Sequence, residues 1–465
     1  MAEQKLGSRP KFFGTNGVRG VINVDYYPDF FLHIAMAFGT IIKDKDIVIG
    51  SDGRSSLHTV KGAVTSGLTA TGHDVIDIGL LPVPALQYYC KTHGLYGVMI
   101  TASHNPPEYN GVKFIDKNGS EVEENFQNLV ERGYLSSAYI ASSKEKTPSG
   151  SRIGYAKWDG MGTVNEDRSA KAAYINGIMK GVDCESIRKA GLRVLCDCVN
   201  GATSETTPML LRALGVKEIT LNSNIDWRFP AHNSEPVMGN IKDTMEMTKK
   251  AGVDLAVAHD SDGDRAVFVS PEGRYLDGNY SLAVASLNKV RRGDTVVTPI
   301  STSDIVEIVV GRVGGKLIKT RTGAPVVIHE MVRRKAKLGG EENGGTIFGP
   351  HQYCRDGAMT LALWLEAIAK DDLGTILKRL PDLHYRRDRV ETKADFNKIK
   401  AALEGKRNSG IDYSDGMKLQ LGRKSWIMVR PSGTEPVIRL YAQAESEESL
   451  DRILKEYKNA IEKLG

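Results

Sequence analysis

The stretch Asp260-Ser261-Asp262-Gly263-Asp264-Arg265 places three carboxylates on alternate residues, and a cation follows them directly. The apolar run 254–259 just before it predicts a short strand. The acidic loop then leaves the carboxyl end of that strand, where open α/β sheets bind their ligands. Three aspartates, with no His or Cys within the loop, favour Mg²⁺ over Zn²⁺. The stretch therefore predicts a magnesium loop in an α/β protein.

Two other interpretations of this loop need to be weighed. An EF-hand requires glycine at its sixth position and a bidentate Glu at its twelfth, whereas here Gly263 is fourth and Pro271 is twelfth. We reject it on that ground. A polar turn between two apolar runs is a fair alternative for an isolated Asp-x-Asp-x-Asp pattern, so the decision depends on the other motifs.

Length, charge and cysteine content limit the class of protein. A chain of 465 residues predicts about three domains. A net charge of +5 with both signs interspersed argues against a nucleic-acid surface. The longest apolar run, 30–42, is too short to span a bilayer, and the N-terminus has no secretory signal. Five scattered cysteines fit reduced thiols. We expect a cytoplasmic protein without nucleic-acid or membrane partners, and small acidic substrates stay open.

Strand and helix patterns alternate along most of the chain, which is typical of βα units around a mostly parallel sheet. The Ser- and Lys-rich residues 136–152 predict a linker, and the pattern restarts after it and again beyond residue 277. The C-terminal part has an α+β pattern instead. We therefore predict three similar α/β domains and a smaller C-terminal one, with the bounds 1–155, 156–275, 276–382 and 383–465.

Ser103 lies in a second loop of interest, Thr101–Pro107, which follows the predicted strand 96–100. A serine there can accept a phosphoryl group, because this transfer needs a positioned oxygen and neutralised charge more than a strong nucleophile. A Ser or Asx turn uses the same residue types and is the alternative. Lys113, in the next predicted strand, is a candidate acid or base, or an ordinary solvated lysine.

Three further loops carry groups that bind anions or hydroxyls. Gly14–Gly20 combines glycines with Arg19. Residues 339–345 offer a carboxylate and an amide to sugar hydroxyls. Arg430–Pro436 combines a guanidinium, two hydroxyls and N–H groups around a glycine, which suits a phosphate. Taken alone, the first loop is a weak signal, and the second could equally be a solvated turn. The alternative for the third is a hairpin turn, but this loop is richer in anion donors than a turn requires.

In this order along the chain, the loops resemble those of the α-D-phosphohexomutases. Thr101–Pro106 resembles the phosphoserine loop, Asp260–Arg265 the metal loop, Gly340–Gly345 the sugar-recognition loop and Arg430–Pro436 the phosphate-binding loop. The resemblance is nearest to the phosphoglucosamine mutase branch and to archaeal phosphoglucomutase/phosphomannomutase-like members. It implies three α/β/α domains with mixed sheets plus a smaller α+β domain around a central cleft.

The resemblance also implies roles for particular residues. Ser103 would carry the phosphoryl group and ligate Mg²⁺ together with Asp260, Asp262 and Asp264. The reaction centre would be lined by Ser103, His104, Arg19 and Lys113, with Lys113 as the proton-transfer group. The implied substrate-binding residues are Arg265, Glu341, Asn343, Arg430, Ser432, Gly433 and Thr434.

The resemblance implies an intramolecular phosphotransferase that interconverts hexose 6-phosphate and hexose 1-phosphate through a hexose 1,6-bisphosphate. Glucosamine, glucose and mannose phosphates are the candidate substrates. Many relatives have Ser and a final His in the sugar loop, where this chain has Asn343 and Gly345, so the sugar preference and the general acid or base stay open. The rival functions are a Mg²⁺-dependent sugar phosphatase and a non-catalytic sugar-phosphate sensor. Homo-oligomerisation and the first phosphorylation of Ser103 also stay open.

Overall fold

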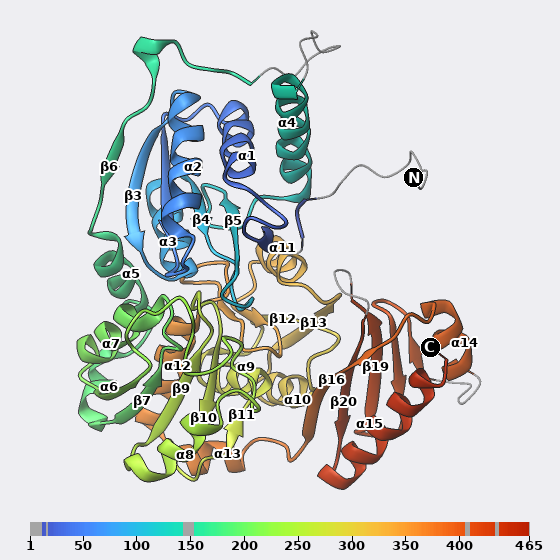
Figure 1. The fold of residues 1–465 in the computed structure, drawn as a ribbon. Helices are drawn as coiled ribbons and strands as arrows, with labels where there is room; N and C mark the ends of the chain where they lie inside the picture. The colour runs from blue at the N-terminus through green and yellow to red at the C-terminus, as the bar shows by residue number, and fades with distance from the viewer. Residues whose placement is uncertain (1–11, 15–16, 143–152, 405–409, 433–436, 465) are drawn as a thin grey trace. The chain divides into compact units, whose positions relative to one another are not determined.

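The computed structural model describes residues 12–14, 17–142, 153–404, 410–432 and 437–464, without the side chains of 136–142 (Figure 1). The chain divides into two compact units. The first is built from residues 1–276 and 345–369, and the second from residues 277–344 and 370–465. The chain therefore passes between the units at 276/277, 344/345 and 369/370.

The first unit begins with a six-stranded mixed sheet in the order β1-β5-β4-β2-β3-β6. Strands β2, β3, β4 and β6 run parallel, and β5 pairs antiparallel with both β1 and β4. Its strands are β1 (Val18–Val21), β2 (Asp46–Ser51), β3 (Asp74–Leu80), β4 (Tyr96–Ile100), β5 (Tyr109–Ile115) and β6 (Val164–Glu166). The helices in this part of the chain are α1 (Pro28–Ile41), α2 (Leu57–Ala70), α3 (Val83–His93), α4 (Glu124–Ser142) and the short 3₁₀ turn Trp158–Gly160.

The predicted linker at 136–152 begins too early, because α4 continues to Ser142. The Ser- and Ala-rich end of this helix has a composition that is also typical of linkers, and this misled the prediction. The remainder of the predicted linker, 143–152, lies outside the described residues.

A second sheet in the same unit has the order β11-β10-β9-β7-β8. Strands β7, β8 and β9 are parallel, while β10 returns antiparallel to β9 directly after the acidic loop. Its strands are β7 (Arg193–Asp197), β8 (Lys217–Leu221), β9 (Leu255–His259), β10 (Ala266–Val269) and β11 (Tyr275–Leu276). The later segment of this unit, 345–369, adds β15 (Thr346–Phe348), which is not a strand of this sheet. The helices are α5 (Ala170–Met179), α6 (Cys184–Ala190), α7 (Thr203–Ala213), α8 (Lys242–Ala251) and α12 (Gly357–Lys370).

The second unit contains a parallel set in the order β13-β12-β14 and an antiparallel sheet in the order β16-β20-β19-β18-β17. Its strands are β12 (Thr295–Pro299), β13 (Lys316–Thr320), β14 (Leu338–Gly340), β16 (His384–Glu391), β17 (Ile411–Asp412), β18 (Met417–Gln420), β19 (Trp426–Pro431) and β20 (Val437–Ala444). Its helices are α9 (Gly278–Lys289), α10 (Asp304–Arg312), α11 (Ala324–Arg334), α13 (Leu373–Lys378), α14 (Phe396–Glu404) and α15 (Glu447–Glu462).

Apolar burial holds these layers together and leaves their polar loops at strand ends. In α1, Phe31, Ile34 and Phe38 are fully buried in one core with residues of the first sheet. Burial of each such side chain contributes about 1.5–3 kcal/mol relative to exposure. The parallel neighbours β2 and β4 end at the same edge, so the loops that follow them lie side by side.

Candidate active site

Ser103 sits in an unusual backbone conformation. Its φ is +52°, in the left-handed region that residues with a Cβ rarely adopt. The neighbouring Thr101 supports this shape, because its Oγ1 accepts a hydrogen bond from the Ser103 N–H at 2.7 Å. Thr101 Oγ1 in turn donates to the buried carboxylate of Asp52 at 2.7 Å. The loop is thus held from the end of β2.

Arg54 is the strongest support of the Thr101–Pro107 loop. Its guanidinium is buried, pairs with Asp52 at 3.1 Å and donates to four backbone carbonyls. Those carbonyls belong to Ser103, Asn105 (2.8 Å), Pro106 (2.7 Å) and Tyr109 (2.8 Å). The sequence shows Arg54 just after a predicted strand, which is a signal for a site position, yet the pattern assigns it no partner.

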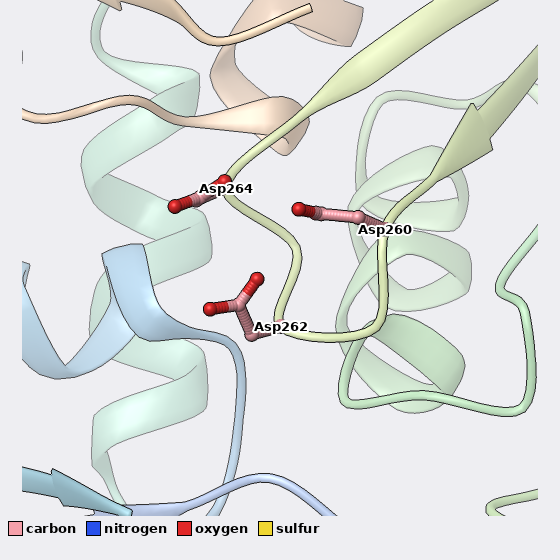
Figure 2. A group of neighbouring side chains, drawn as sticks. All are labelled: Asp260, Asp262 and Asp264. Carbon is pink, nitrogen blue, oxygen red and sulfur yellow. The ribbon is translucent and has the colours of Figure 1, made fainter. Parts of the chain in front are cut away.

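The acidic loop brings its three carboxylates together (Figure 2). One ligand atom from each of Asp260, Asp262 and Asp264 lies within 4.8 Å of the others, and all three residues are buried. Gly263, with φ +73°, makes the turn between the last two. As predicted, the loop leaves the carboxyl end of β9.

This cluster suits a hard cation. Asp260 Oδ2 and Asp264 Oδ1 are buried and have no hydrogen-bond partner among the described residues. Burial, followed by the charges of the other two aspartates, raises the pKa of Asp260 well above its ordinary value. Burial opposes ionisation of Asp262 too, but Lys113 and Arg19 outweigh it and lower the pKa of that carboxyl. A divalent cation would coordinate the oxygens that lack hydrogen bonds and would reduce the repulsion between the carboxylates.

The two predicted loops meet at Asp262. Ser103 Oγ donates to Asp262 Oδ1 at 2.9 Å, and the buried Lys113 Nζ donates to Asp262 Oδ2 at 3.0 Å. A second contact joins the loop backbones, because Ser261 Oγ donates to the Ser103 carbonyl at 2.6 Å. Residues about 160 positions apart in the sequence therefore form one buried cluster. Lys113 is not the solvated lysine of the alternative interpretation.

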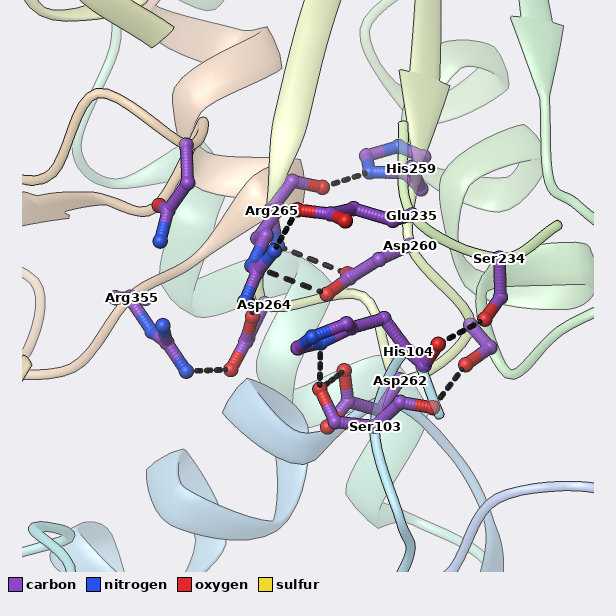
Figure 3. Close-up of polar contacts among 12 residues, drawn as sticks. Ser103, His104, Ser234, Glu235, His259, Asp260, Asp262, Asp264, Arg265 and Arg355 are labelled. Carbon is purple, nitrogen blue, oxygen red and sulfur yellow. Dashed lines mark hydrogen bonds and ion pairs between the residues drawn. The ribbon is translucent and has the colours of Figure 1, made fainter. Parts of the chain in front are cut away.

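Arg265 and His104 complete the predicted set around this cluster (Figure 3). Arg265 Nε lies 3.6 Å from Asp260 Oδ2, and its Nη1 pairs with Glu235 at 3.2 Å. His104 Nδ1 lies 3.3 Å from Ser103 Oγ. Burial, then the charges of Arg265 and Arg19, lower the pKa of His104 well below its ordinary value. His104 is therefore neutral at physiological pH.

Arg19 lies near the same centre but on a different element from the one expected. It belongs to strand β1, which pairs with β5, and not to a glycine loop. Its Nη1 donates to the carbonyl of Ala102 and to Asn105 Oδ1, both at 3.3 Å. Its side chain thus reaches the Thr101–Pro107 loop, and the anion contact stays a prediction. Thr15 and Asn16 of the glycine stretch lie outside the described residues.

Three site residues lacked a recognisable sequence signal. Ser234 Oγ donates to the His104 carbonyl at 2.8 Å, and Glu235 pairs with Arg265 (Figure 3). Both come from the long connection between β8 and α8. Arg355, just before α12, donates from Nη2 to Asp264 Oδ2. None of the three follows directly on a predicted strand, so only the folded chain reveals them.

The second unit brings together the sugar-recognition and phosphate-binding loops at the start of α11. Glu341 Oε1 accepts from the N–H of Gly323 at 3.1 Å. The preceding N–H, of Thr322, donates to Asp415 at 2.7 Å, and Asp415 pairs with Arg430 Nε at 2.8 Å. Adjacent backbone donors thus anchor both loops. The pattern strand–Thr-Gly–helix, read together with Pro325, was a usable signal for this anchor.

The remaining predicted residues of this unit are partly accessible. Asn343 follows Glu341 in the sugar-recognition loop, and its side chain lies 3.5 Å from Glu341 Oε2. Ser432, directly after β19, donates its N–H to the Val437 carbonyl at 2.9 Å. Gly433 and Thr434 lie outside the described residues.

Comparison with known proteins identifies the class. The chain belongs to the phosphoglucomutase/phosphomannomutase family, the α-D-phosphohexomutases. Its matches are the α/β/α domain I at residues 10–139, domain II at 172–273, domain III at 277–384 and the C-terminal domain at 385–460. The predicted family, three-plus-one domain architecture and isomerase class of phosphotransferase are confirmed.

Several relatives are similar over nearly their whole length. A phosphoglucomutase/phosphomannomutase of Thermococcus kodakarensis is 38% identical over 94% of this chain and 95% of its own. A phosphoglucosamine/phosphogalactosamine mutase of Sulfurisphaera tokodaii is 36% identical over 97% and 99%. A phosphopentomutase of Thermococcus kodakarensis is 33% identical over 95% and 96%. The names of these relatives give different substrates, so similarity alone does not identify the sugar.

A solved structure agrees with the fold. A putative phosphomannomutase from Thermus thermophilus superimposes with a TM-score of 0.82 at 25% identity, covering 98% of this chain and 100% of the other. Separately, none of the helices in the described ranges has the length and apolar character needed to cross a membrane.

Proposed function

We propose that this phosphohexomutase interconverts hexose 6-phosphate and hexose 1-phosphate, with Ser103 as the phosphoryl carrier. The proposal rests chiefly on the contact of Ser103 Oγ with Asp262, 2.9 Å away inside a buried three-carboxylate cluster. A hydroxyl in this position needs no strong base, since phosphoryl transfer depends mainly on positioning and charge neutralisation.

The transfer step conserves atoms and protons. Attack by a sugar hydroxyl breaks the bond between phosphorus and Ser103 Oγ and forms a new bond to the sugar oxygen, giving a hexose 1,6-bisphosphate. The proton of the sugar hydroxyl ends on Ser103 Oγ. The second half of the cycle reverses these events from the other phosphate. Return of the phosphoryl group restores the carrier serine.

Lys113 is the proton-transfer group in this proposal. Its Nζ and Ser103 Oγ bind the two oxygens of one carboxylate, Asp262, so the lysine lies beside the oxygen that gains or loses the proton. His104, neutral and 3.3 Å from Ser103 Oγ, supplies a second polar contact to that oxygen. Lys113 is fully buried and His104 is partly buried, which limits the access of water to the phosphoryl group.

Asp260, Asp262 and Asp264 would hold Mg²⁺ together with Ser103, and the bound ion would lower the electrostatic cost of gathering phosphoryl oxygens there. The two buried carboxylate oxygens without hydrogen bonds, on Asp260 and Asp264, support this assignment. Arg265 and Arg19 add fixed positive charge, and neither can give up its proton to become a base.

The second unit supplies contacts for the rest of the substrate. Arg430 and Ser432, with Gly433 and Thr434, would bind the phosphate that is not reacting, while Glu341 and Asn343 would bind sugar hydroxyls. Their shared anchor on α11 supports a joint role, because it fixes the distance between sugar and phosphate contacts. We propose glucosamine, glucose or mannose phosphates as the substrate class.

Purified protein assayed separately with the 6-phosphates of glucosamine, glucose and mannose tests the proposal, with intact-mass measurement of the Ser103 peptide. We expect isomerisation that requires Mg²⁺, depends on a bisphosphate activator and carries one phosphoryl group on Ser103. Ser103→Ala should abolish it, whereas Ser66→Ala, on the exposed side of α2, should not. Inorganic phosphate as the main product, without need of a bisphosphate, would instead identify a phosphatase.

A further inference from the structure

Arg355 stands out among the charged groups that the proposed mechanism leaves unused. Its side chain is buried, and it donates to Asp264 Oδ2. Among the described residues, this is the one hydrogen bond that Asp264 receives. Lys113 Nζ and Arg265 Nε lie farther away, each 3.8 Å from an Asp264 oxygen. The orientation of the Asp264 carboxylate therefore depends on Arg355 (Figure 3).

The backbone just after Arg355 is fixed against the acidic loop. The N–H of Gly357 donates to the Gly263 carbonyl at 3.2 Å. A Cβ at Gly357 would lie 2.6 Å from the Arg265 carbonyl and 2.7 Å from His259 Nδ1, so only glycine allows this approach. The segment before α12 and the acidic loop are thus packed backbone to backbone.

Asp356 locks the same segment from its other side. It is buried, and its carboxylate accepts from Tyr174 Oη at 2.6 Å, from Gln352 Nε2 at 2.9 Å and from the N–H of Met359 at 2.9 Å. Its own N–H donates to the Thr346 carbonyl at 2.9 Å. These four hydrogen bonds fix Asp356. The side chain of the neighbouring Arg355 therefore starts from a fixed backbone position.

The consequence for the metal site is geometric. Arg355 occupies Oδ2 of Asp264, and the other oxygen, Oδ1, stays buried without a hydrogen bond, as does Asp260 Oδ2. A carboxylate bound at one oxygen by a guanidinium presents the other to a cation in a defined direction. We propose that Arg355 is a positioning residue that orients Asp264 to ligate the metal, an inference that rests on the proposed function.

The planar guanidinium matters as much as its charge. Arginine combines a rigid fork of donors with weak hydration, so it keeps a buried carboxylate in one orientation, whereas lysine offers a mobile point charge. Partners of metal ligands outside the coordination sphere typically change metal affinity 10–100-fold when they are removed. Arg355→Lys should therefore bind metal more weakly than the wild type, and Arg355→Met more weakly still.

Titration of the unphosphorylated protein with Mn²⁺, followed by the electron paramagnetic resonance signal of free Mn²⁺ without any sugar phosphate, tests this inference. We expect Arg355→Met to raise the Kd for Mn²⁺ about 10–100-fold. The matched control Arg212→Met removes an arginine from an exposed pair with Glu218 and should leave the Kd unchanged. Wild-type affinity in Arg355→Met or in Arg355→Lys would overturn the inference.

A double-mutant cycle separates orientation of Asp264 from general damage. If Arg355 acts through Asp264, Arg355→Met should weaken Mn²⁺ binding little further in the Asp264→Asn background. An equal loss in both backgrounds would contradict the inference. Failure of the wild-type protein to bind Mn²⁺ would refute the proposed metal site itself, a different result. Should Arg355→Met not fold, Arg355→Lys carries the test.

Discussion

At the scale of single residues, Arg54 performs two functions at once. It compensates the buried carboxylate of Asp52 and holds the backbone of the Thr101–Pro107 loop. Burial raises the pKa of Asp52, and Arg54 and Thr101 offset part of that rise. Removal of the arginine leaves a desolvated carboxylate without its cation and removes one donor from each of four carbonyls, of which the Ser103 carbonyl keeps its bond from Ser261 Oγ.

We therefore expect Arg54→Met to lower the free energy of unfolding by about 3–5 kcal/mol, the usual cost of breaking a buried ion pair. Urea unfolding followed by circular dichroism measures it. The double variant Asp52→Asn/Arg54→Met should lose less free energy of unfolding than the sum of the two single variants, because it leaves no unpaired buried charge. The surface variant Arg168→Met should keep the urea midpoint of the wild type. A wild-type midpoint for Arg54→Met would refute the supporting role of Arg54.

Ser103 combines backbone strain with its proposed role as phosphoryl carrier. Its left-handed conformation costs about 1–2 kcal/mol for a residue with a Cβ and almost nothing for glycine. Ser103→Gly and Ser103→Ala should both lack isomerase activity, yet Ser103→Gly should be the more stable by about 1 kcal/mol. Thermal unfolding of the two variants side by side decides the matter. Greater stability of the alanine variant would show that the loop relaxes.

At the scale of elements, the connection from β8 to α8 ties the second sheet to the site. It carries Ser234 and Glu235, and its His232 donates from Nε2 to the buried Asp197 at 3.1 Å. Burial lowers the pKa of His232, but the hydrogen bond and charge of Asp197 outweigh it, and the pKa is raised. The contact with Asp197 thus holds the connection in place and is strongest when His232 is protonated.

A raised histidine pKa means that the folded state binds the proton more tightly than the unfolded chain. The stabilising effect of His232 is therefore complete below the unfolded value of about 6.5, and it is lost as pH rises through the folded pKa. The stability difference between wild type and His232→Gln should shrink from pH 6 to pH 9. Urea unfolding across that range measures it, and a constant difference would contradict the pairing with Asp197.

At the scale of the whole molecule, the C-terminal sheet is joined firmly to the rest of the second unit. Gln443 on β20 is fully buried, and its Oε1 accepts from Ser303 Oγ at 2.7 Å and from the Asp304 N–H at 2.8 Å, at the start of α10. Lys418 Nζ also donates to the Ile300 carbonyl at 2.8 Å. We therefore expect the C-terminal domain and residues 277–344 to move as one body.

Gln443→Leu should uncouple the two parts of this unit. Each buried donor or acceptor left without a partner costs about 1–3 kcal/mol. We expect calorimetry to show an additional transition at lower temperature, and trypsin to cut the C-terminal domain faster. The exposed Gln420 lies on the same sheet, and Gln420→Leu serves as its control. An unchanged calorimetric trace for Gln443→Leu would show that the contact does not couple these parts.

Much of the architecture was predictable from local patterns. The alternation of strands and helices predicts the α/β domains, and the acidic loop after residues 254–259 predicts a metal site, because strand ends and carboxylate spacing are properties of short segments. Ser103 and Lys113 were predictable for the same reason. The end of α4 was not, because its composition serves a helix and a linker equally well.

Other features were decided only by the tertiary structure. The pairing of Arg54 with four carbonyls, of Arg355 with Asp264, and of two distant loops with α11 depends on residues far apart in the chain. A sequence shows that such side chains are charged, but burial determines which partner each one takes. The sequence itself thus determined the chemical groups of this site, and packing determined their orientation. The reason is that a charge removed from water is stable only when the folded chain pairs it with an opposite charge.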